Sequence, residues 1–151
     1  MLLFTYLCES QFDIYQFMKT RIISILLLFC NIAYAGQPWK VQLFASKEKI
    51  TLDINLYEET IDVPGMEMFG PMNGYLGGEI YGVWAITSFN IKKNKAILRL
   101  SNDLGSETQE AELTQSSDTT YTLKLLGNTV VKKVEGRKLI KIAPTLNMKR
   151  R

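Results

Sequence analysis

The stretch KITLDINLY, residues 49–57, decides the fold class of this chain. Its apolar residues Ile50, Leu52, Ile54 and Leu56 recur at every second position, and mostly polar residues lie between them. A period of two is typical of a β-strand, because successive side chains point to opposite faces of a sheet. The stretch therefore predicts a strand with one face on a core and the other toward water.

The same period recurs through most of the chain after residue 36. WKVQLFA (39–45) alternates similarly, and EIYGVWAITSFNI (79–91) is apolar on both faces, which predicts a central strand. Pro144 is expected to end the last strand. Five further strands are expected: AILRLS (96–101), ETQEAELT (107–114), TYTLKLL (120–126), TVVKKV (129–134) and RKLIKIA (137–143).

Short turn sequences separate these strands, at residues 92–95, 102–105, 127–128 and 135–136. Strands joined by tight turns form antiparallel meanders. No segment shows a convincing helical stripe of apolar residues. We therefore expect an all-β fold in which an antiparallel meander of about eight strands closes into a small barrel, with a β-sandwich as the alternative.

Residues 18–35 have the layout of a secretory signal peptide. Lys19 and Arg21 give a positively charged start, residues 22–30 form a short apolar run, and AYA at 33–35 offers the small residues that signal peptidase accepts. The apolar run is too short for a membrane span, which needs roughly 20 residues. No stable membrane insertion is therefore expected.

The signal peptide sets the expected limits of the mature protein. Residues 1–17 match no part of a signal and are interpreted as a spurious extension upstream of a start at Met18. Cleavage after Ala35 would leave residues 36–151 as a single β-rich domain that begins at Gly36. Because this domain would be exported without cysteine, we expect it to be secreted or periplasmic, in a bacterial envelope.

The composition excludes several catalytic chemistries. The chain has no histidine, which rules out Ser-His-Asp and Cys-His arrangements and zinc sites that need imidazole. Both cysteines, Cys8 and Cys30, precede the predicted mature start, so the domain has no thiol nucleophile. We therefore expect a protein that is not an enzyme and has no cofactor.

The charged residues are segregated along the second half of the chain. Residues 102–119 carry only acidic charges, whereas residues 120–151 carry nine basic residues and one acid, Glu135. We expect oppositely charged strands to pair across one sheet face; alternatively, the basic C-terminal hairpin contacts a protein partner. The net charge of +3 is small, and aromatic residues do not interleave with the basic ones as in a nucleic-acid groove, so no nucleic-acid partner is expected.

The segment VPGMEMFGPMNGYLGG, residues 63–78, is the strongest candidate binding feature. It holds five glycines, two prolines and three methionines, but only one charge, Glu67. Long loops in compact domains are usually functional or disordered. The favoured interpretation is a lid over one end of the core, with at least two methionines buried; the alternative is a loop that grips a ligand. The candidate ligand-binding residues are Met66, Met68, Phe69, Met72, Tyr75 and Trp84.

A third interpretation of this segment is a copper site. Met66, Met68 and Met72 form an M-x-M-x-x-x-M pattern, and thioethers favour Cu(I). The M-x-M step resembles the periplasmic copper- and silver-binding chaperones of efflux systems, which are small β-barrels. That resemblance implies a nearby tryptophan, for which Trp39 or Trp84 could serve, and a histidine, which this chain lacks.

The tripeptide Gly82-Val83-Trp84 is similar to the G-x-W element of lipocalin-like (calycin) barrels, and the C-terminal hairpins resemble theirs. In that family the element lies on the first strand, whereas here it falls well into the chain. The resemblance implies a cup for a ligand. The strand pattern alone predicts an ordinary core tryptophan at position 84.

These observations favour an exported, non-catalytic binding or interaction module whose partner is a small apolar ligand or a protein. One alternative is a structural or assembly component of the cell envelope, which should present an exposed strand edge or a self-association patch. The other is a periplasmic Cu(I)-binding protein that uses the methionine-rich loop.

Overall fold

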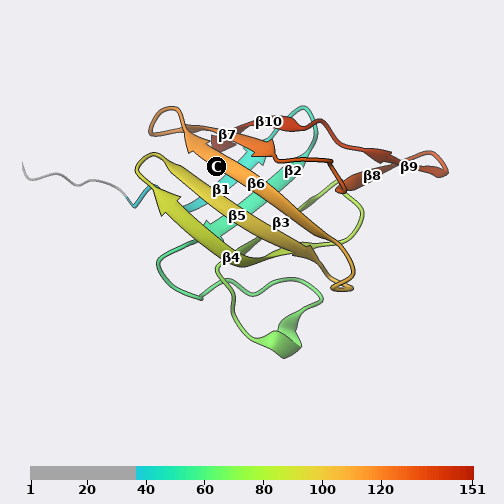
Figure 1. Cartoon of the computed structure of the whole chain (residues 1–151), viewed down its shortest axis with the longest axis horizontal. Helices are drawn as coiled ribbons and strands as arrows, with labels where there is room; N and C mark the ends of the chain where they lie inside the picture. Colours follow the sequence, from blue (N-terminus) through green and yellow to red (C-terminus); the bar gives the residue numbers. More distant parts are fainter. Residues whose placement is uncertain (1–36) are drawn as a thin grey trace, which may run out of the picture. The chain divides into compact units, whose positions relative to one another are not determined.

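Within residues 37–151, the part of the chain that the computed structural model describes, eight antiparallel strands close into a barrel (Figure 1). Two further strands form a separate ribbon. The predicted upstream extension (1–17), the predicted signal peptide (18–35) and the predicted mature start at Gly36 lie outside the described residues.

The strand order around the barrel is β1-β10-β7-β6-β5-β4-β3-β2, and every neighbouring pair is antiparallel. The all-β meander is therefore confirmed, and it is a barrel rather than a sandwich. The barrel strands are β1 (Lys40–Ala45), β2 (Ile50–Asn55), β3 (Gly74–Gly78), β4 (Trp84–Lys92), β5 (Lys95–Asn102), β6 (Thr108–Gln115), β7 (Thr120–Leu125) and β10 (Thr145–Arg150). The ribbon strands are β8 (Lys132–Glu135) and β9 (Lys138–Lys141), and the one helical element of the described part is a 3-10 helix, η1 (Glu67–Phe69).

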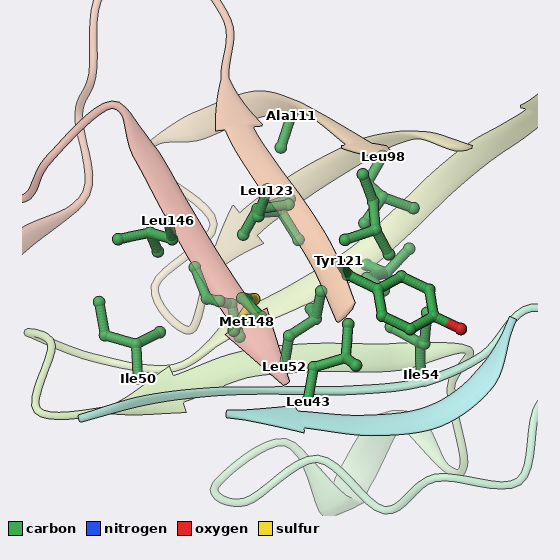
Figure 2. Close-up of a cluster of buried hydrophobic side chains, with 14 of the residues drawn as sticks. Leu43, Ile50, Leu52, Ile54, Leu98, Ala111, Tyr121, Leu123, Leu146 and Met148 are labelled. Atoms are coloured by element: carbon green, nitrogen blue, oxygen red, sulfur yellow. The ribbon is translucent and has the colours of Figure 1, made fainter. Parts of the chain in front are cut away.

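The apolar residues that alternate along β2 fill part of the barrel interior. Ile50, Leu52 and Ile54 of β2 point inward and are fully buried, as predicted. Figure 2 shows these side chains meeting inward-pointing residues of β1, β5, β6, β7 and β10, most of them leucine. An eight-stranded barrel has an interior just wide enough for side chains to fill, and here side chains occupy it.

Two tryptophans lie toward opposite ends of the barrel. Trp39, just before β1, packs edge-on against Tyr121 with ring centroids 6.5 Å apart, and the Tyr121 hydroxyl donates to the carbonyl of Pro38 at 2.9 Å. Trp84 starts β4, which runs antiparallel to β1, so it lies at the other end. Its side chain is 2% exposed, as the strand pattern predicted, and its indole N–H donates to the carbonyl of Tyr81 at 3.3 Å.

β3 was not predicted, because it lies inside the glycine-rich segment interpreted as a loop. Its glycines make the strand possible rather than preventing it. Gly74 and Gly78 have φ angles of 144° and 105°. A Cβ at Gly74 would collide with the carbonyl of Asp53 in β2, and a Cβ at Gly78 would collide with the carbonyl of Lys49, just before β2. Glycine is the residue that tolerates both the backbone angle and the close approach.

The predicted strand 79–91 begins only at Trp84, and residues 79–83 form a turn. The expectation of a central strand holds for residues 84–86, which are buried, and is wrong for residues 87–91, which are exposed. The physical reason is that β4 pairs with β3 only at Tyr75–Ala85 and Leu76–Trp84 and then runs on past the start of β3.

The predicted C-terminal strands are placed differently from expectation. The segments 129–134 and 137–143 do not enter the barrel; their central residues form the β8–β9 ribbon. Pro144 does not end the last strand. It precedes β10, which pairs with both β7 and β1 and so closes the barrel. Proline is compatible with this position because a residue just before a strand need not donate to the ladder.

The predicted pairing of the acidic and basic segments holds where β6 lies beside β7, whereas most of the basic residues lie on the β8–β9 ribbon, outside the barrel. Glu110 of β6 lies opposite Arg99 of β5, and Glu112 lies opposite Lys124 of β7. The Lys95 ammonium bonds the Glu112 carboxylate at 2.9 Å and thereby lowers the pKa of that carboxyl. Glu112 is thus paired with a cation of a neighbouring strand, whereas Glu110 lies opposite Arg99 in register only.

Candidate functional site

Residues 56–73, which connect β2 to β3, form a flap whose base is fixed by hydrogen bonds. Ile61 and Met72 exchange two backbone bonds, of 3.0 and 2.8 Å, in an isolated antiparallel bridge. At the junction with β2, the buried Asn55 side chain donates to the Thr60 hydroxyl at 2.7 Å, and the Asn73 side chain donates to the carbonyl of Asn55 at 3.1 Å. The flap is therefore attached at both ends.

The flap covers the outer wall of the barrel, not its end. Leu76 and Trp84 form the inward cross-strand pair of β3 and β4, so the neighbouring pair Tyr75 and Ala85 faces outward. Ala85 nevertheless has no exposed surface, because a second apolar cluster lies over it. This cluster consists of Val63, Met66 and Ala85, with Met72, Tyr75 and Val83 packed against it. The expected lid on one end of the core is thus corrected to a cover on the β3–β4 wall.

The three methionines have different surroundings. Met66 is 8% exposed within the second cluster, and Met72 is partly buried against it. Met68 is 88% exposed. Two of the three methionines therefore pack against the protein, as expected of a segment that is folded down, while one faces solvent.

The tip of the flap is an ordered apolar surface. η1 places Met68 and Phe69 side by side in the chain, and Phe69 is 64% exposed. The backbone N–H of Phe69 donates to the carbonyl of Met66, and the N–H of Gly65 donates to the Glu67 carboxylate at 2.9 Å. Backbone N–H groups of Glu67 and Gly65 lower the pKa of the Glu67 carboxyl. The one charge of this segment therefore stabilises the turn that presents the two apolar side chains.

The predicted ligand-binding residues do not form one site. Trp84 belongs to the barrel core, on the opposite face of β4 from Ala85. Tyr75 lies under the flap, in the second cluster. Only Met68 and Phe69, at the tip, offer large exposed apolar surface. Met66 and Met72 pack in the second cluster, whereas Met68 faces solvent. The three thioethers are therefore not presented together, as a Cu(I) site would require.

A hollow of about 270 Å³ lies beside the base of the flap, between β1, β2 and residues 60–61. Asp53 lines it, and partial burial raises the pKa of this carboxyl, although the amide of Gln42 donates to it at 3.3 Å. Lys40 lines the same hollow. The alternation of β2 places Asp53 on the outer face, but no sequence pattern indicates that Thr60 and Ile61 return to this point.

The outer half of β4, residues 87–92, is an exposed strand edge. These residues pair with β5 along one side, and along the other side they extend beyond the first residue of β3. Phe89 and Ile91 are partly exposed here. An edge of this kind presents unpaired backbone groups that can accept another strand. It is one feature expected of an assembly component.

The β8–β9 ribbon corresponds to the basic C-terminal hairpin that the sequence predicts. It projects from the barrel at the right of Figure 1. Val134 is 61% exposed and Leu139, which lies directly opposite, is 48% exposed. Its base is tied to the barrel through the buried side chain of Gln109, which donates to the carbonyl of Leu126 at 2.8 Å and accepts from the N–H of Val130 at 3.0 Å.

Comparison of the chain with protein-family models, with curated proteins and with solved structures finds no match. Among residues 37–151, no helix has the length and apolar character needed to span a membrane. In the same residues, no three carboxylates gather as they would around a metal ion.

Proposed function

We propose that this chain is an exported, non-catalytic interaction module that binds a protein partner through the tip of the flap. The observation that carries the proposal is the exposure of Met68 and Phe69 on an ordered 3-10 turn. Large apolar side chains held out at a fixed position are typical of a binding surface, since burial of each would contribute about 1.5–3 kcal/mol. Met68 adds adaptability, because an unbranched thioether repacks against different partners.

A surface site is favoured over an internal cup. The similarity of Gly82-Val83-Trp84 to lipocalin-like barrels would place a small apolar ligand inside the barrel. Leucine side chains occupy that space, and Trp84 is part of the same packing. Binding at the flap requires no displacement of the core, so the protein partner is preferred to the small apolar ligand.

The experiment is site-specific photo-crosslinking in the envelope of a Gram-negative host. A photoreactive residue at position 68 or 69 should give a discrete adduct of the same mass, and Phe69→Asp should remove the adduct formed from position 68. Position 124 is the control, because Lys124 is exposed on β7, away from the flap. The proposal fails if positions 68 and 69 give no adduct, or if position 124 gives the same one.

Export is the second part of the proposal, and it rests on the sequence of residues 18–35. A chain expressed in a Gram-negative host should be recovered from the periplasm or medium with Gly36 as its first residue. Edman sequencing of the recovered protein checks this. Recovery of a chain that retains residues 1–17 would contradict both the export and the start at Met18.

An assembly component of the envelope is the second candidate, because of the exposed edge of β4. Antiparallel pairing of residues 87–92 with another copy would satisfy the unpaired backbone groups and cover Phe89 and Ile91. Ile91→Pro, which removes a backbone donor that faces away from β5, should then abolish a dimer seen by analytical ultracentrifugation. A monomeric wild-type protein at high concentration would exclude this candidate.

A further inference from the structure

The β8–β9 ribbon is short and exposed, so it would be only marginally stable without support from the barrel. Each strand has four residues, and no side chain of residues 132–141 is fully buried. Isolated two-stranded hairpins are marginal in water. This ribbon is instead held from its base, where the N–H of Tyr81 donates to the carbonyl of Lys132 at 2.7 Å and the Lys141 ammonium donates to Asn128 at 2.8 Å. The barrel therefore presents the ribbon at a fixed place.

The side chains of the ribbon combine cations with aliphatic groups on both faces. In the antiparallel register Val134 lies opposite Leu139, which places the two aliphatic side chains on one face, whereas Ile140 lies on the other. The sequence KKVEGRKLIK (132–141) contains four lysines and one arginine but one carboxylate, that of Glu135. It contains no aromatic residue and no neutral hydrogen-bonding side chain.

The excess positive charge of the ribbon is not neutralised within its own chain. The acidic residues of β6 lie beside Arg99, Lys95 and Lys124 on neighbouring strands. Glu107 lies 3.5 Å from Lys132, at the base of the ribbon. The cations nearest the tip, Arg137 and Lys138, are exposed and form no ion pair within residues 37–151. The exposed carboxylates of Glu58, Glu59 and Asp62 on the flap are the anionic groups that a second copy would offer, so the choice between a second copy and a lipid surface rests on the other side chains of the ribbon.

We infer that the ribbon docks onto an anionic phospholipid surface. Protein interfaces are enriched in aromatic residues and arginine and depleted of lysine, which is the reverse of this composition. Aliphatic side chains surrounded by lysines suit the membrane interface, because the long stems let ammonium groups reach headgroups while the aliphatic groups enter the boundary of the acyl chains. The binding is peripheral and involves the ribbon alone.

The test is co-sedimentation with vesicles. The full chain, purified in the form that a Gram-negative host yields, is mixed with vesicles of equal parts phosphatidylglycerol and phosphatidylcholine, or of phosphatidylcholine alone. Binding should be at least about 10-fold tighter to the anionic vesicles and should weaken as salt rises, because screening weakens exposed charge interactions. The triple variant Lys133→Gln/Arg137→Gln/Lys138→Gln, which keeps the Lys141–Asn128 anchor, should bind on the order of 100-fold less tightly, since each cation near such a surface contributes about 1 kcal/mol.

Two control variants show whether vesicle binding depends on the ribbon itself, on the net charge of the protein or on the flap. Lys40→Gln/Lys92→Gln/Lys93→Gln removes three exposed lysines at the other end of the barrel and should change binding less than about 3-fold, being outside the contact. Met68→Ser/Phe69→Ser removes the flap tip and should leave vesicle binding intact, so failure of the proposed function does not affect this result. Loss of binding in either variant overturns the assignment to the ribbon.

The aliphatic side chains distinguish a lipid surface from an acidic protein. Val134→Ser/Leu139→Ser keeps every charge and should weaken binding to anionic vesicles several-fold. Circular dichroism should show an unchanged fold, because both side chains lie outside the core. Equal binding to neutral and anionic vesicles, or no binding to either, would overturn the inference; an acidic protein surface would then be the remaining complement for these cations.

Discussion

At the scale of single residues, Trp84 connects the turn before β4 to the barrel core. Its side chain is almost fully buried and its indole N–H is bonded to the carbonyl of Tyr81. Trp84→Ala should lower the free energy of unfolding by about 3–5 kcal/mol, the range for emptying a large aromatic site. Urea unfolding measures this. Tyr81→Ala, at a side chain that is 56% exposed, is the control and should cost little. A near-neutral Trp84→Ala would contradict its place in the core.

Asp53 gives a prediction about pH at the same scale. Partial burial raises the pKa of its carboxyl in the folded state, so folding favours the protonated form, and this group lowers stability once it is ionised. This loss of stability is absent at pH values below the ordinary pKa of the carboxyl, and it is fully present above the raised pKa that Asp53 has in the folded protein. Asp53→Asn should therefore stabilise the protein at neutral pH.

The gain from Asp53→Asn should disappear as the pH falls through the folded pKa of Asp53. Unfolding by urea at a series of pH values, for wild type and variant, measures the difference. Glu112→Gln is the opposite case: Lys95 lowers the pKa of Glu112, so its contribution should be present at neutral pH and lost on acidification. A gain from Asp53→Asn that persists at low pH would show that packing, rather than ionisation, causes it.

At the scale of elements, alternation predicts the strands whose two faces differ in polarity. β1, β2, β5, β6 and β7 were all predicted from this pattern, because one face of each is in the core. β3 was missed because a strand rich in glycine has almost no side-chain pattern. β10 was missed because Pro144 was interpreted as an end, and the ribbon was placed in the barrel because periodicity does not distinguish a buried strand from an exposed one.

Gly74 allows a direct test of why glycine is needed in β3. Gly74→Ala should destabilise the protein more than Gly65→Ala, by about 2 kcal/mol or more, because its Cβ would collide with the backbone of β2. Gly65 also has a positive φ, of 79°, but open space around it. The comparison therefore separates the close approach from backbone strain. Equal costs in urea unfolding would contradict the tight β2–β3 contact.

At the scale of the whole molecule, the composition of residues 63–78 correctly indicates a segment that packs onto the body of the protein. Its position could not be predicted, since it depends on which face of β3 and β4 points outward, and that follows from the register of a strand that sequence pattern misses. The separation of Trp84 from the flap follows from the same register. The hollow at Asp53 forms because Thr60 and Ile61 pack beside β1 and β2, and no local sequence pattern predicts that position.

The central claim is that the flap tip, and not the barrel interior, is the binding surface. Peroxide oxidation of the three methionines, read by peptide mass spectrometry on the purified protein and on intact cells that express it, tests it most directly. In the purified protein Met68 should oxidise fastest and Met66 slowest, because exposure controls sulfoxide formation. In cells the ratio of Met68 to Met66 oxidation should fall, because the partner covers the tip. An unchanged ratio would contradict the claim, and rapid oxidation of Met66 in the purified protein would contradict the packing of the flap.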